Sequence, residues 1–133
     1  MKHWRFMDYH DQGGVNLIKE WYRKQGPELQ AAFTFAVQEI AVTEDLSTLS
    51  SFIRLTNRHI GLFEIRIQTI EARSKKRQFR PVGFWSLNPN ELILVDGCEK
   101  SGRVTIPVGV FDAALDIQLE YYRDGKGTIY EHF

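Results

Sequence analysis

The sequence predicts an α+β fold in which a small antiparallel or mixed sheet is packed by an N-terminal αα-hairpin and a C-terminal helix. Three observations predict it: two adjacent segments of helical periodicity near the N-terminus, strand-like segments over residues 61–95, and a third helical segment over residues 107–123. No repeat, low-complexity tract or linker divides the chain. We therefore expect one domain over residues 1–133, with the element order β-αα-βββ-α.

The N-terminal part of the chain predicts one strand and two helices. Residues 3–9 alternate in polarity, and residues 11–14 break the strand. The first helix is indicated by the helical spacing of Val15, Ile18, Trp21 and Tyr22. The second helix starts at Pro27, because proline is favoured at the first helical position. Its apolar stripe consists of Leu29, Phe33, Ala36, Val37 and Ile40.

The middle of the chain predicts three strands. Residues 52–55 are expected to pack beneath the connector that precedes them, and residues 61–67 alternate as a strand does. A second strand covers residues 78–87 and bulges or leaves the sheet near Pro81, because proline lacks the backbone donor of the ladder. Residues 92–95 are apolar throughout, which indicates a strand buried on both faces.

The closing helix, predicted over residues 107–123, has a wide apolar surface. One stripe consists of Phe111, Ala114, Leu115, Gln118 and Tyr122. A second stripe beside it consists of Val110, Ala113, Ile117 and Tyr121. Two interpretations stay open: the helix is deeply packed, or part of this surface contacts a second copy in a homodimer.

The composition indicates a soluble globular protein. Hydrophobic residues make up 43% and charged residues 26%, which excludes a disordered tail and a fibrous repeat. No apolar run approaches the roughly 20 residues of a membrane span, and the first residues contain no signal-peptide core. Cys98 is the single cysteine, so no internal disulfide can form. We therefore expect a cytoplasmic location, away from membranes.

A net charge of zero conceals an uneven distribution of charge. Residues 54–103 hold ten Lys and Arg against five Asp and Glu, a balance of +5, whereas the rest of the chain carries −5. The densest basic segment contains Arg73, Lys75, Lys76, Arg77 and Arg80. One interpretation is a charged hairpin tip that discourages strand pairing. The other is a contact with a polyanion, because cations around an aromatic suit phosphates and stacked bases.

Several common site motifs are absent from the sequence. Gly13-Gly14 lacks the spacing of a phosphate-binding loop, and no serine lies in a nucleophile-elbow motif. The histidines and the cysteine are too scattered to form a metal-ligand pattern. We expect neither a metal nor another cofactor. Cys98 follows an apolar strand and precedes Glu99, which predicts a structural thiol with a raised pKa.

Four short segments resemble the RelE/HigB-like toxins of toxin–antitoxin systems, a branch of the RelE/ParE superfamily that includes phage-derived members. Residues 61–67 (Gly-Leu-Phe-Glu-Ile-Arg-Ile) resemble the GLYELR strand of that family, and Phe79-Arg80 resembles the aromatic–arginine pair of its next strand. Residues 92–100 resemble its apolar strand ending in lysine, and residues 106–122 its closing helix. The resemblance covers residues 15–123 and implies a RelE-like fold.

The resemblance also implies an endoribonuclease that cleaves mRNA, usually on the ribosome, and is neutralised by an antitoxin protein. A ribose 2′-hydroxyl attacks the neighbouring phosphate without a metal, and fixed cations stabilise the charge that develops on phosphorus. By position, Arg80 would bind the phosphate, Lys100 would be the cation at the strand end, and Arg66 would project from the neighbouring strand. An ion pair with Glu64 is the alternative for Arg66. His132 would transfer a proton, with a frayed terminus as its alternative.

The remaining basic residues of the middle segment are implied contacts to the backbone of ribosomal or messenger RNA. They are Arg73, Lys75, Lys76, Arg77 and Arg103. The sequence also departs from the family, because it is neutral overall, has Phe111 where some members have tyrosine, and has one lysine where several have a basic pair. These departures motivate the alternative of a non-catalytic protein with the same fold, either a gyrase inhibitor or a phage-encoded interaction protein.

Overall fold

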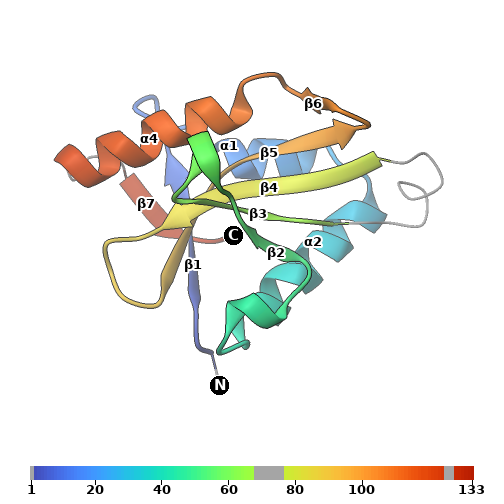
Figure 1. Cartoon of the computed structure of the whole chain (residues 1–133), viewed down its shortest axis with the longest axis horizontal. Coiled ribbons are helices and arrows are strands. Elements are labelled where there is room, and N and C mark those ends of the chain that lie inside the picture. The colour runs from blue at the N-terminus through green and yellow to red at the C-terminus, as the bar shows by residue number, and fades with distance from the viewer. Residues whose placement is uncertain (1, 68–76, 125–127) are drawn as a thin grey trace.

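Seven strands and three α helices make up the part of the chain that a computed structural model describes, which is residues 2–67, 77–124 and 128–133 (Figure 1). In chain order they are β1 (Arg5–His10), α1 (Leu17–Arg23), α2 (Pro27–Ala41), β2 (Phe52–Arg54), β3 (Leu62–Ile65), β4 (Arg77–Trp85), β5 (Glu91–Ser101), β6 (Val104–Ile106), α4 (Val110–Asp124) and β7 (Thr128–Glu131). Two single-turn 3₁₀ segments, η1 (Leu46–Thr48) and η2 (Asn57–His59), precede β2 and β3.

The seven strands form one sheet with the order β2-β3-β4-β5-β1-β7, and β6 pairs with β5 outside this path. β1 lies parallel to β5, and every other described pair of strands is antiparallel. β1 pairs with residues 91–94 of β5 and β6 with residues 99–101, so these two strands share one edge of the long strand β5. The N-terminal strand therefore lies inside the sheet.

The predicted fold class is wrong. The sequence predicted an N-terminal αα-hairpin and a small sheet, whereas the structure is a mixed α/β fold whose seven-stranded, mostly antiparallel sheet has helices interleaved among its strands. The difference comes from β2, β6 and β7, three strands that the sequence analysis did not predict. Each is only three or four residues long. A segment this short shows little periodicity of its own, and its pairing partner makes it a strand.

The first helical layer follows from local sequence signals. Asn16 caps α1, because its side chain accepts a hydrogen bond of 3.0 Å from the backbone N–H of Lys19. α2 begins at Pro27 as predicted. The predicted stripe of α2 is buried against one face of the sheet, where it forms a core with Phe6, Phe63 and other apolar residues.

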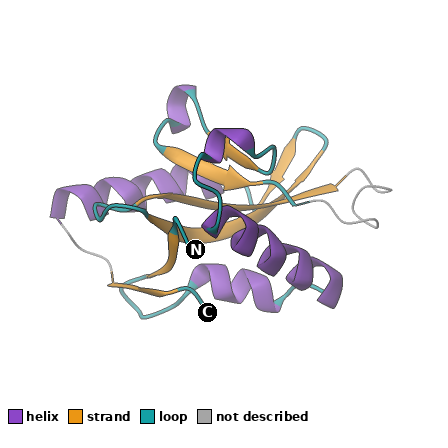
Figure 2. Ribbon diagram, turned by 90° about the horizontal axis from the view of Figure 1, so that it is seen from below, coloured by secondary structure: helices purple, strands orange, loops and turns teal. Residues whose placement is uncertain are grey.

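The opposite face of the sheet packs against α4, so the sheet lies between two helical layers (Figure 2). This second core contains Val82, Phe84 and Ile93 of the sheet together with Ala114 and Tyr121 of α4. Each layer buries one side of its helices. None of the helices in the described part of the chain combines the length and the hydrophobicity that a membrane crossing requires.

The helix α4 starts later than predicted, at Val110 instead of residue 107. Gly109 has a positive φ of 83°, a conformation that an α helix does not contain, so the helix begins after it. Val110, Ala114 and Tyr121 are buried, which supports deep packing for that part of the apolar surface. Leu119 is exposed, and the predicted homodimer through residues 107–123 stays a prediction.

The long antiparallel pair of β4 and β5 carries most of the candidate site. Its register shifts between Val82 and Gly83, next to Pro81, where the sequence predicted a bulge. Pro81 itself stays in the strand opposite Gly97. A Cβ at Gly83 would clash with the carbonyl oxygen of Ile93, so glycine is required where the two strands approach.

Candidate anion-binding site

Three basic residues that the sequence singled out lie on one face of the sheet: Arg66 directly after β3, Arg80 on β4 and Lys100 on β5. Glu64 pairs with Val82 and Ile67 with Phe79, which places Arg66 directly across from Arg80. Arg80 in turn pairs with Cys98, and Lys100 lies two residues further along β5. Directly opposed residues project to the same face of a sheet. We call Arg66, Arg80 and Lys100 the cationic row, and it lies on the α4 side of the sheet.

A buried carboxylate holds two members of this row. The side chain of Glu64 is 1% exposed, and both of its oxygens accept hydrogen bonds of 3.3 Å from Nη1 of Arg80. Arg66 donates from Nε to Oε1 of Glu64 at 3.1 Å. Gln78 accepts a further hydrogen bond from Nη2 of Arg80. Glu64 therefore orients both guanidinium groups, and the predicted ion pair between Arg66 and Glu64 is present.

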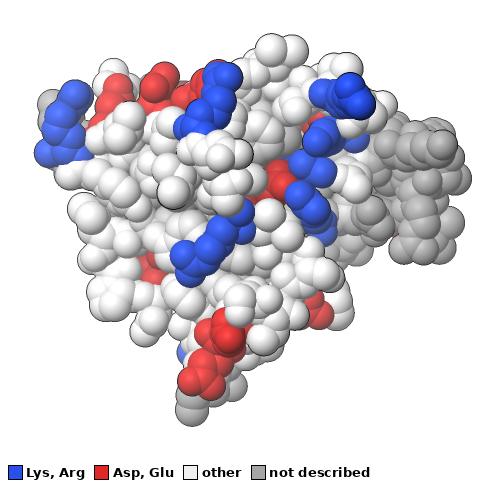
Figure 3. Space-filling model, in the orientation of Figure 1, with Lys and Arg blue, Asp and Glu red and all other residues white. Residues whose placement is uncertain are grey.

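The charges of the row do not cancel. Among the described residues, Arg66 and Arg80 share the carboxylate of Glu64, and Lys100 adds a third cation two residues beyond the partner of Arg80 on β5. Glu99 projects to the other face because it alternates with Lys100 along β5. Figure 3 shows Lys and Arg side chains gathered near the ends of β4, β5 and β6. A local surplus of positive charge attracts anions. This face of the sheet is thus suited to binding an anionic group.

Accessibility differs along the row. The side chain of Arg80 is 10% exposed, and its Nε is buried without a hydrogen-bond partner among the described residues. The side chain of Arg66 is 42% exposed, and Lys100 is half-buried. An incoming anion would therefore reach Arg66 and Lys100 first. Arg80 lies deeper than the other two cations, and its guanidinium is less open to solvent than we expect of a residue that binds phosphate directly.

The other predicted RNA-binding residues are placed only in part. Arg73, Lys75 and Lys76 lie outside the described residues. Arg77 begins β4 opposite Ser101, with its backbone described and its side chain not. Arg103 is exposed in the turn between β5 and β6, close in sequence to Lys100. Their contacts to RNA stay predictions.

The structure does not bring His132 to the cationic row. His132 follows β7, which pairs with β1, and its ring packs against Phe33 of α2 at 5.6 Å between centroids. It therefore lies on the α1/α2 side of the sheet, whereas the row lies on the α4 side. Its Nδ1 is 2.6 Å from Oδ1 of the buried Asp8, so the alternative of a frayed terminus is also excluded for this side chain.

Cys98 lies in the sheet directly across from Arg80 and is fully buried. Burial, with a smaller contribution from the carboxylate of Glu64, raises the pKa of its thiol to about 12. Its Sγ donates a weak hydrogen bond to the carbonyl oxygen of Arg80 at 3.4 Å. The prediction of a structural thiol with a raised pKa is confirmed, and Cys98 is not a nucleophile at neutral pH.

The sequence analysis missed two contacts of Arg80 in the site. One is with Glu64, and the other is with Gln78. Alternation along residues 61–67 had already placed Glu64 and Arg66 on one face. The pairing of Glu64 with Arg80 depends on how β3 and β4 align across the intervening residues, which no local pattern reveals. Gln78 carried only a weak signal, its spacing of two residues from Arg80 on the same strand.

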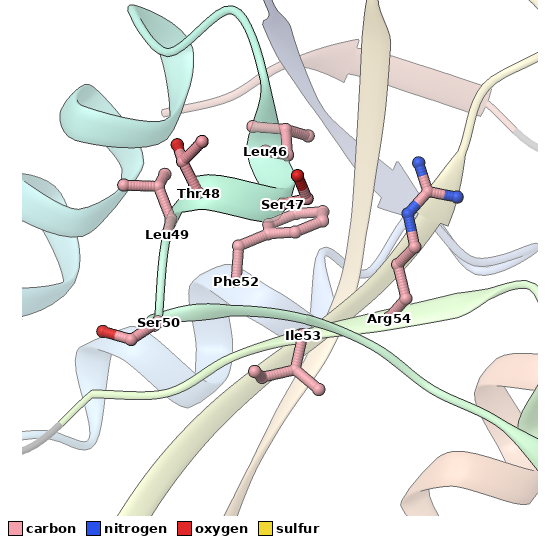
Figure 4. A pocket seen from close by; sticks show the side chains of 8 residues that line it. All are labelled: Leu46, Ser47, Thr48, Leu49, Ser50, Phe52, Ile53 and Arg54. Atoms are coloured by element: carbon pink, nitrogen blue, oxygen red, sulfur yellow. The ribbon is translucent and has the colours of Figure 1, made fainter.

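A separate open hollow of about 520 Å³ lies at the β2 edge of the sheet (Figure 4). Phe52 and Ile53 point to opposite sides of the β2 ribbon within it. The guanidinium of Arg54 lies 4.5 Å from the ring centroid of Trp85 and is engaged in a cation–π contact. The polar groups that line this hollow are hydroxyl groups and the guanidinium of Arg54, which is already engaged. The hollow is therefore a weaker candidate for anion binding than the cationic row.

The described residues also limit what else the site could hold. No three His, Cys, Asp or Glu side chains among them come together in a way that could bind a metal ion. The nitrogen atoms of the cationic row belong to positively charged side chains, so they repel metal ions and attract anions.

Comparison of the chain with protein-family models, with curated proteins and with solved structures found no match.

Proposed function

We propose that this protein is a toxin-like mRNA endoribonuclease, ribosome-dependent and neutralised by an antitoxin protein. The observation that carries the proposal is the cationic row, three basic side chains on one face of the sheet, two of which are bonded to the buried carboxylate of Glu64. The resemblance of residues 61–67 and 92–100 to RelE/HigB-like toxins supports the same function. The antitoxin is part of the proposal because an active ribonuclease of this kind has to be silenced in its own cell.

The spacing of the row suits the backbone of RNA. Neighbouring strands lie roughly 4.8 Å apart, and residues two apart along a strand are separated by about 6.8 Å. Arg66 and Lys100, which flank Arg80 across the strands, can therefore contact the non-bridging oxygens of one phosphate or of two adjacent phosphates. A guanidinium fixed by a carboxylate binds phosphate through parallel hydrogen bonds with little loss of side-chain entropy.

The proposed reaction is an internal transesterification of RNA. The 2′-oxygen of ribose forms a bond to the neighbouring phosphorus while the bond from phosphorus to the 5′-oxygen breaks, which leaves a 2′,3′-cyclic phosphate and a 5′-hydroxyl. One proton leaves the 2′-hydroxyl and another joins the departing 5′-oxygen. Negative charge grows on the phosphoryl oxygens in the transition state, and Arg66 and Arg80 are held where they can stabilise it.

The proton transfers are assigned to Lys100 and water. Lys100 is half-buried at the solvent side of the row, and its ammonium group can give a proton to the 5′-oxygen. Glu64 is already bonded to Arg66 and Arg80, so it serves as a positioning residue for them. The proton of the 2′-hydroxyl then passes to solvent water, because His132 lies on the other side of the sheet.

One observation favours a second candidate, a non-catalytic interaction protein that uses the same surface to bind nucleic acid or a partner. Arg80 is mostly buried and engaged by Glu64, and no histidine among the described residues accompanies the cationic row. An arrangement without a strong general base binds phosphate well and cleaves it slowly. Binding and cleavage must therefore be measured separately.

The test uses purified protein, ribosomes programmed with a defined mRNA, and mapping of new 5′-hydroxyl ends by primer extension. We expect cleavage, with about a 10²- to 10³-fold loss of rate in Lys100→Gln and in Arg66→Gln. Arg23→Gln is the matched control, because Arg23 is an exposed cation on α1, away from the row. Its rate should equal that of the unaltered protein.

RNA binding, measured as a function of salt, separates the two candidates. Binding without new RNA ends, with a salt dependence that weakens in Lys100→Gln, would replace the enzyme by the non-catalytic candidate. Absence of both cleavage and binding would refute both uses of the row. Cleavage that persists unchanged in Lys100→Gln and Arg66→Gln would place the active site elsewhere.

A further inference from the structure

The guanidinium group of Arg80 has one buried donor without an acceptor. Its Nη1 donates to both oxygens of Glu64 at 3.3 Å, and its Nη2 donates to the amide oxygen of Gln78. Nε has no hydrogen-bond partner among the described residues, although the side chain is only 10% exposed. A buried donor that stays unpaired destabilises the folded state, so this one calls for an explanation.

The unpaired N–H lies on the edge of the guanidinium that is best suited to an oxyanion. Nε–H and one N–H of Nη2 point in parallel along this edge, so two oxygens of one phosphoryl group accept from both at once. Glu64 is bonded through Nη1, which does not belong to this edge. Glu64 therefore fixes the orientation of the guanidinium and leaves the Nε/Nη2 edge to a second acceptor.

Gln78 lies next to both Arg80 and Lys100. It precedes Arg80 by two residues on β4 and pairs with Lys100 across β5, so the three side chains project to the same face of the sheet. Gln78 is half-buried, whereas Arg80 is buried. An anion attracted by Lys100 therefore meets Gln78 beside Arg80. The amide oxygen of Gln78 has to leave Nη2 before one anion can bind both donors of the Nε/Nη2 edge.

The exchange of Gln78 for an anion is favourable when the anion is present. A guanidinium forms shorter and roughly twofold stronger hydrogen bonds with a charged oxyanion than with a neutral amide oxygen. The anion also gives Nε an acceptor, and Lys100 attracts it. The displaced amide of Gln78 can turn toward solvent, where water satisfies it. Without an anion, the amide oxygen is the acceptor for Nη2.

We propose that the amide oxygen of Gln78 occupies the position of a phosphoryl oxygen on Arg80 and is displaced when a phosphate of the RNA binds. Gln78 is thus a positioning residue, because it controls whether the Nε/Nη2 edge of Arg80 takes part in the site. The identity of the anion as RNA phosphate rests on the proposed function, whereas the exchange itself requires only a phosphoryl group. Hydrogen bonds alone are exchanged, and no covalent bond changes.

The test is an NMR titration of the full chain with inorganic phosphate at constant ionic strength. The readouts are the Nε–H signal of Arg80 and the side-chain amide signals of Gln78. We expect the Arg80 proton to move downfield because it gains an acceptor, and the Gln78 signals to move with it, with a dissociation constant of roughly 10 mM or below. An RNA oligonucleotide with 2′-O-methyl riboses, which cannot be cleaved, should move the same signals at a lower concentration.

Two substitutions of Gln78 should change phosphate affinity in opposite directions. Gln78→Ala removes the competing amide oxygen, so we expect affinity to rise about three- to tenfold. Gln78→Glu places a carboxylate on Nη2 that an anion displaces poorly, so we expect affinity to fall at least about tenfold. A glutamine with a merely structural role would lower the affinity in both variants. The backbone amide spectrum of each variant checks its fold.

The controls separate the loss of a glutamine and the gain of a charge from the exchange at Arg80. Gln38 is exposed on α2, on the other side of the sheet, so Gln38→Ala and Gln38→Glu should leave the affinity unchanged. Thr105 pairs with Lys100 on β6 and projects to the same face as the cationic row. Thr105→Glu thus adds the same charge one strand further from Arg80, and should weaken phosphate only about two- to threefold.

Three outcomes would overturn the proposal. They are saturation by phosphate or RNA with the Arg80 Nε–H signal unmoved, an affinity that does not rise in Gln78→Ala, and a loss in Thr105→Glu as large as that in Gln78→Glu. The proposed function fails separately. The expected shifts in a protein that cleaves no RNA would refute the enzyme and support the exchange, whereas RNA cleavage with the Arg80 signal unmoved would refute the exchange alone.

Discussion

Two buried carboxylates lie on opposite faces of the same sheet, and their partners differ. Glu64 is held by Arg66 and Arg80, which carry permanent positive charge, whereas Asp8 is held by neutral donors and by one titratable side chain, His132. The exposed fractions of the two carboxylates are nearly equal, at 1% and 0%. Burial alone therefore does not decide what such a group does.

The choice of partners gives each face its chemistry. Around Glu64 the cations outnumber the carboxylate, so that face keeps a surplus of positive charge at every physiological pH. Around Asp8 the described partners carry no permanent charge, and their hydrogen bonds fix the orientation of the His132 imidazole. The first arrangement suits an anionic group, whereas the second fixes one imidazole ring in place.

Removing Arg80 is expected to have the largest effect on stability. Arg80→Met leaves the buried carboxylate of Glu64 with Arg66 as its one remaining described cation, and we expect the free energy of unfolding to fall by about 3–5 kcal/mol. The measurement is urea unfolding followed by tryptophan fluorescence. The double variant Arg80→Met/Glu64→Gln should recover much of the loss, because it removes the unpaired charge. A loss below about 1 kcal/mol in the single variant would show that the pair is not effectively buried.

Removing the charge of Asp8 is expected to have a smaller effect. Asp8→Asn keeps one oxygen acceptor for Nδ1 of His132, so we expect a loss of about 1–3 kcal/mol in the free energy of unfolding. Asp116→Asn, at an exposed acid of α4, is the control and should be neutral. The NMR signals of the His132 imidazole should move in Asp8→Asn alone. If the two variants are equally stable and the His132 signals are unchanged, the contact between Asp8 and His132 does not exist in solution.

Asp112 is an exposed carboxylate whose partners are one arginine, Arg58, and one histidine, His59. Its removal is expected to have the smallest effect on stability. Hydrogen bonds from His59 and then Arg58 hold the pKa of Asp112 below its ordinary value of 3.8. Because its pKa is lower in the folded state, its contribution is complete above the unfolded value and is lost as the pH falls through the folded value. Asp112→Asn should thus lower the melting temperature slightly at pH 7 and leave it unchanged at about pH 2. Thermal melts across this range provide the measurement, and an equal difference at both pH values would contradict the assignment.

Part of the candidate site could be predicted from local patterns. Alternation along β3 set Glu64 and Arg66 on one face, and the excess of cations in residues 54–103 indicated an anion-binding surface. The partner of Arg80 could not be predicted, because it depends on the alignment of β3 with β4. The placement of His132 could not be predicted either, since β7 is four residues long and becomes a strand through its pairing with β1.

The sequence by itself determined where α1 and α2 lie and where the alternating strand β3 runs, because caps, proline and side-chain periodicity act over a few residues. Tertiary structure decided the seven-stranded sheet, with β1 placed between β5 and β7. It also decided that Arg80 meets Glu64 on one face and that His132 meets Asp8 on the other. The physical reason is that strand partners are chosen by pairing and burial between distant segments, which a local pattern does not encode.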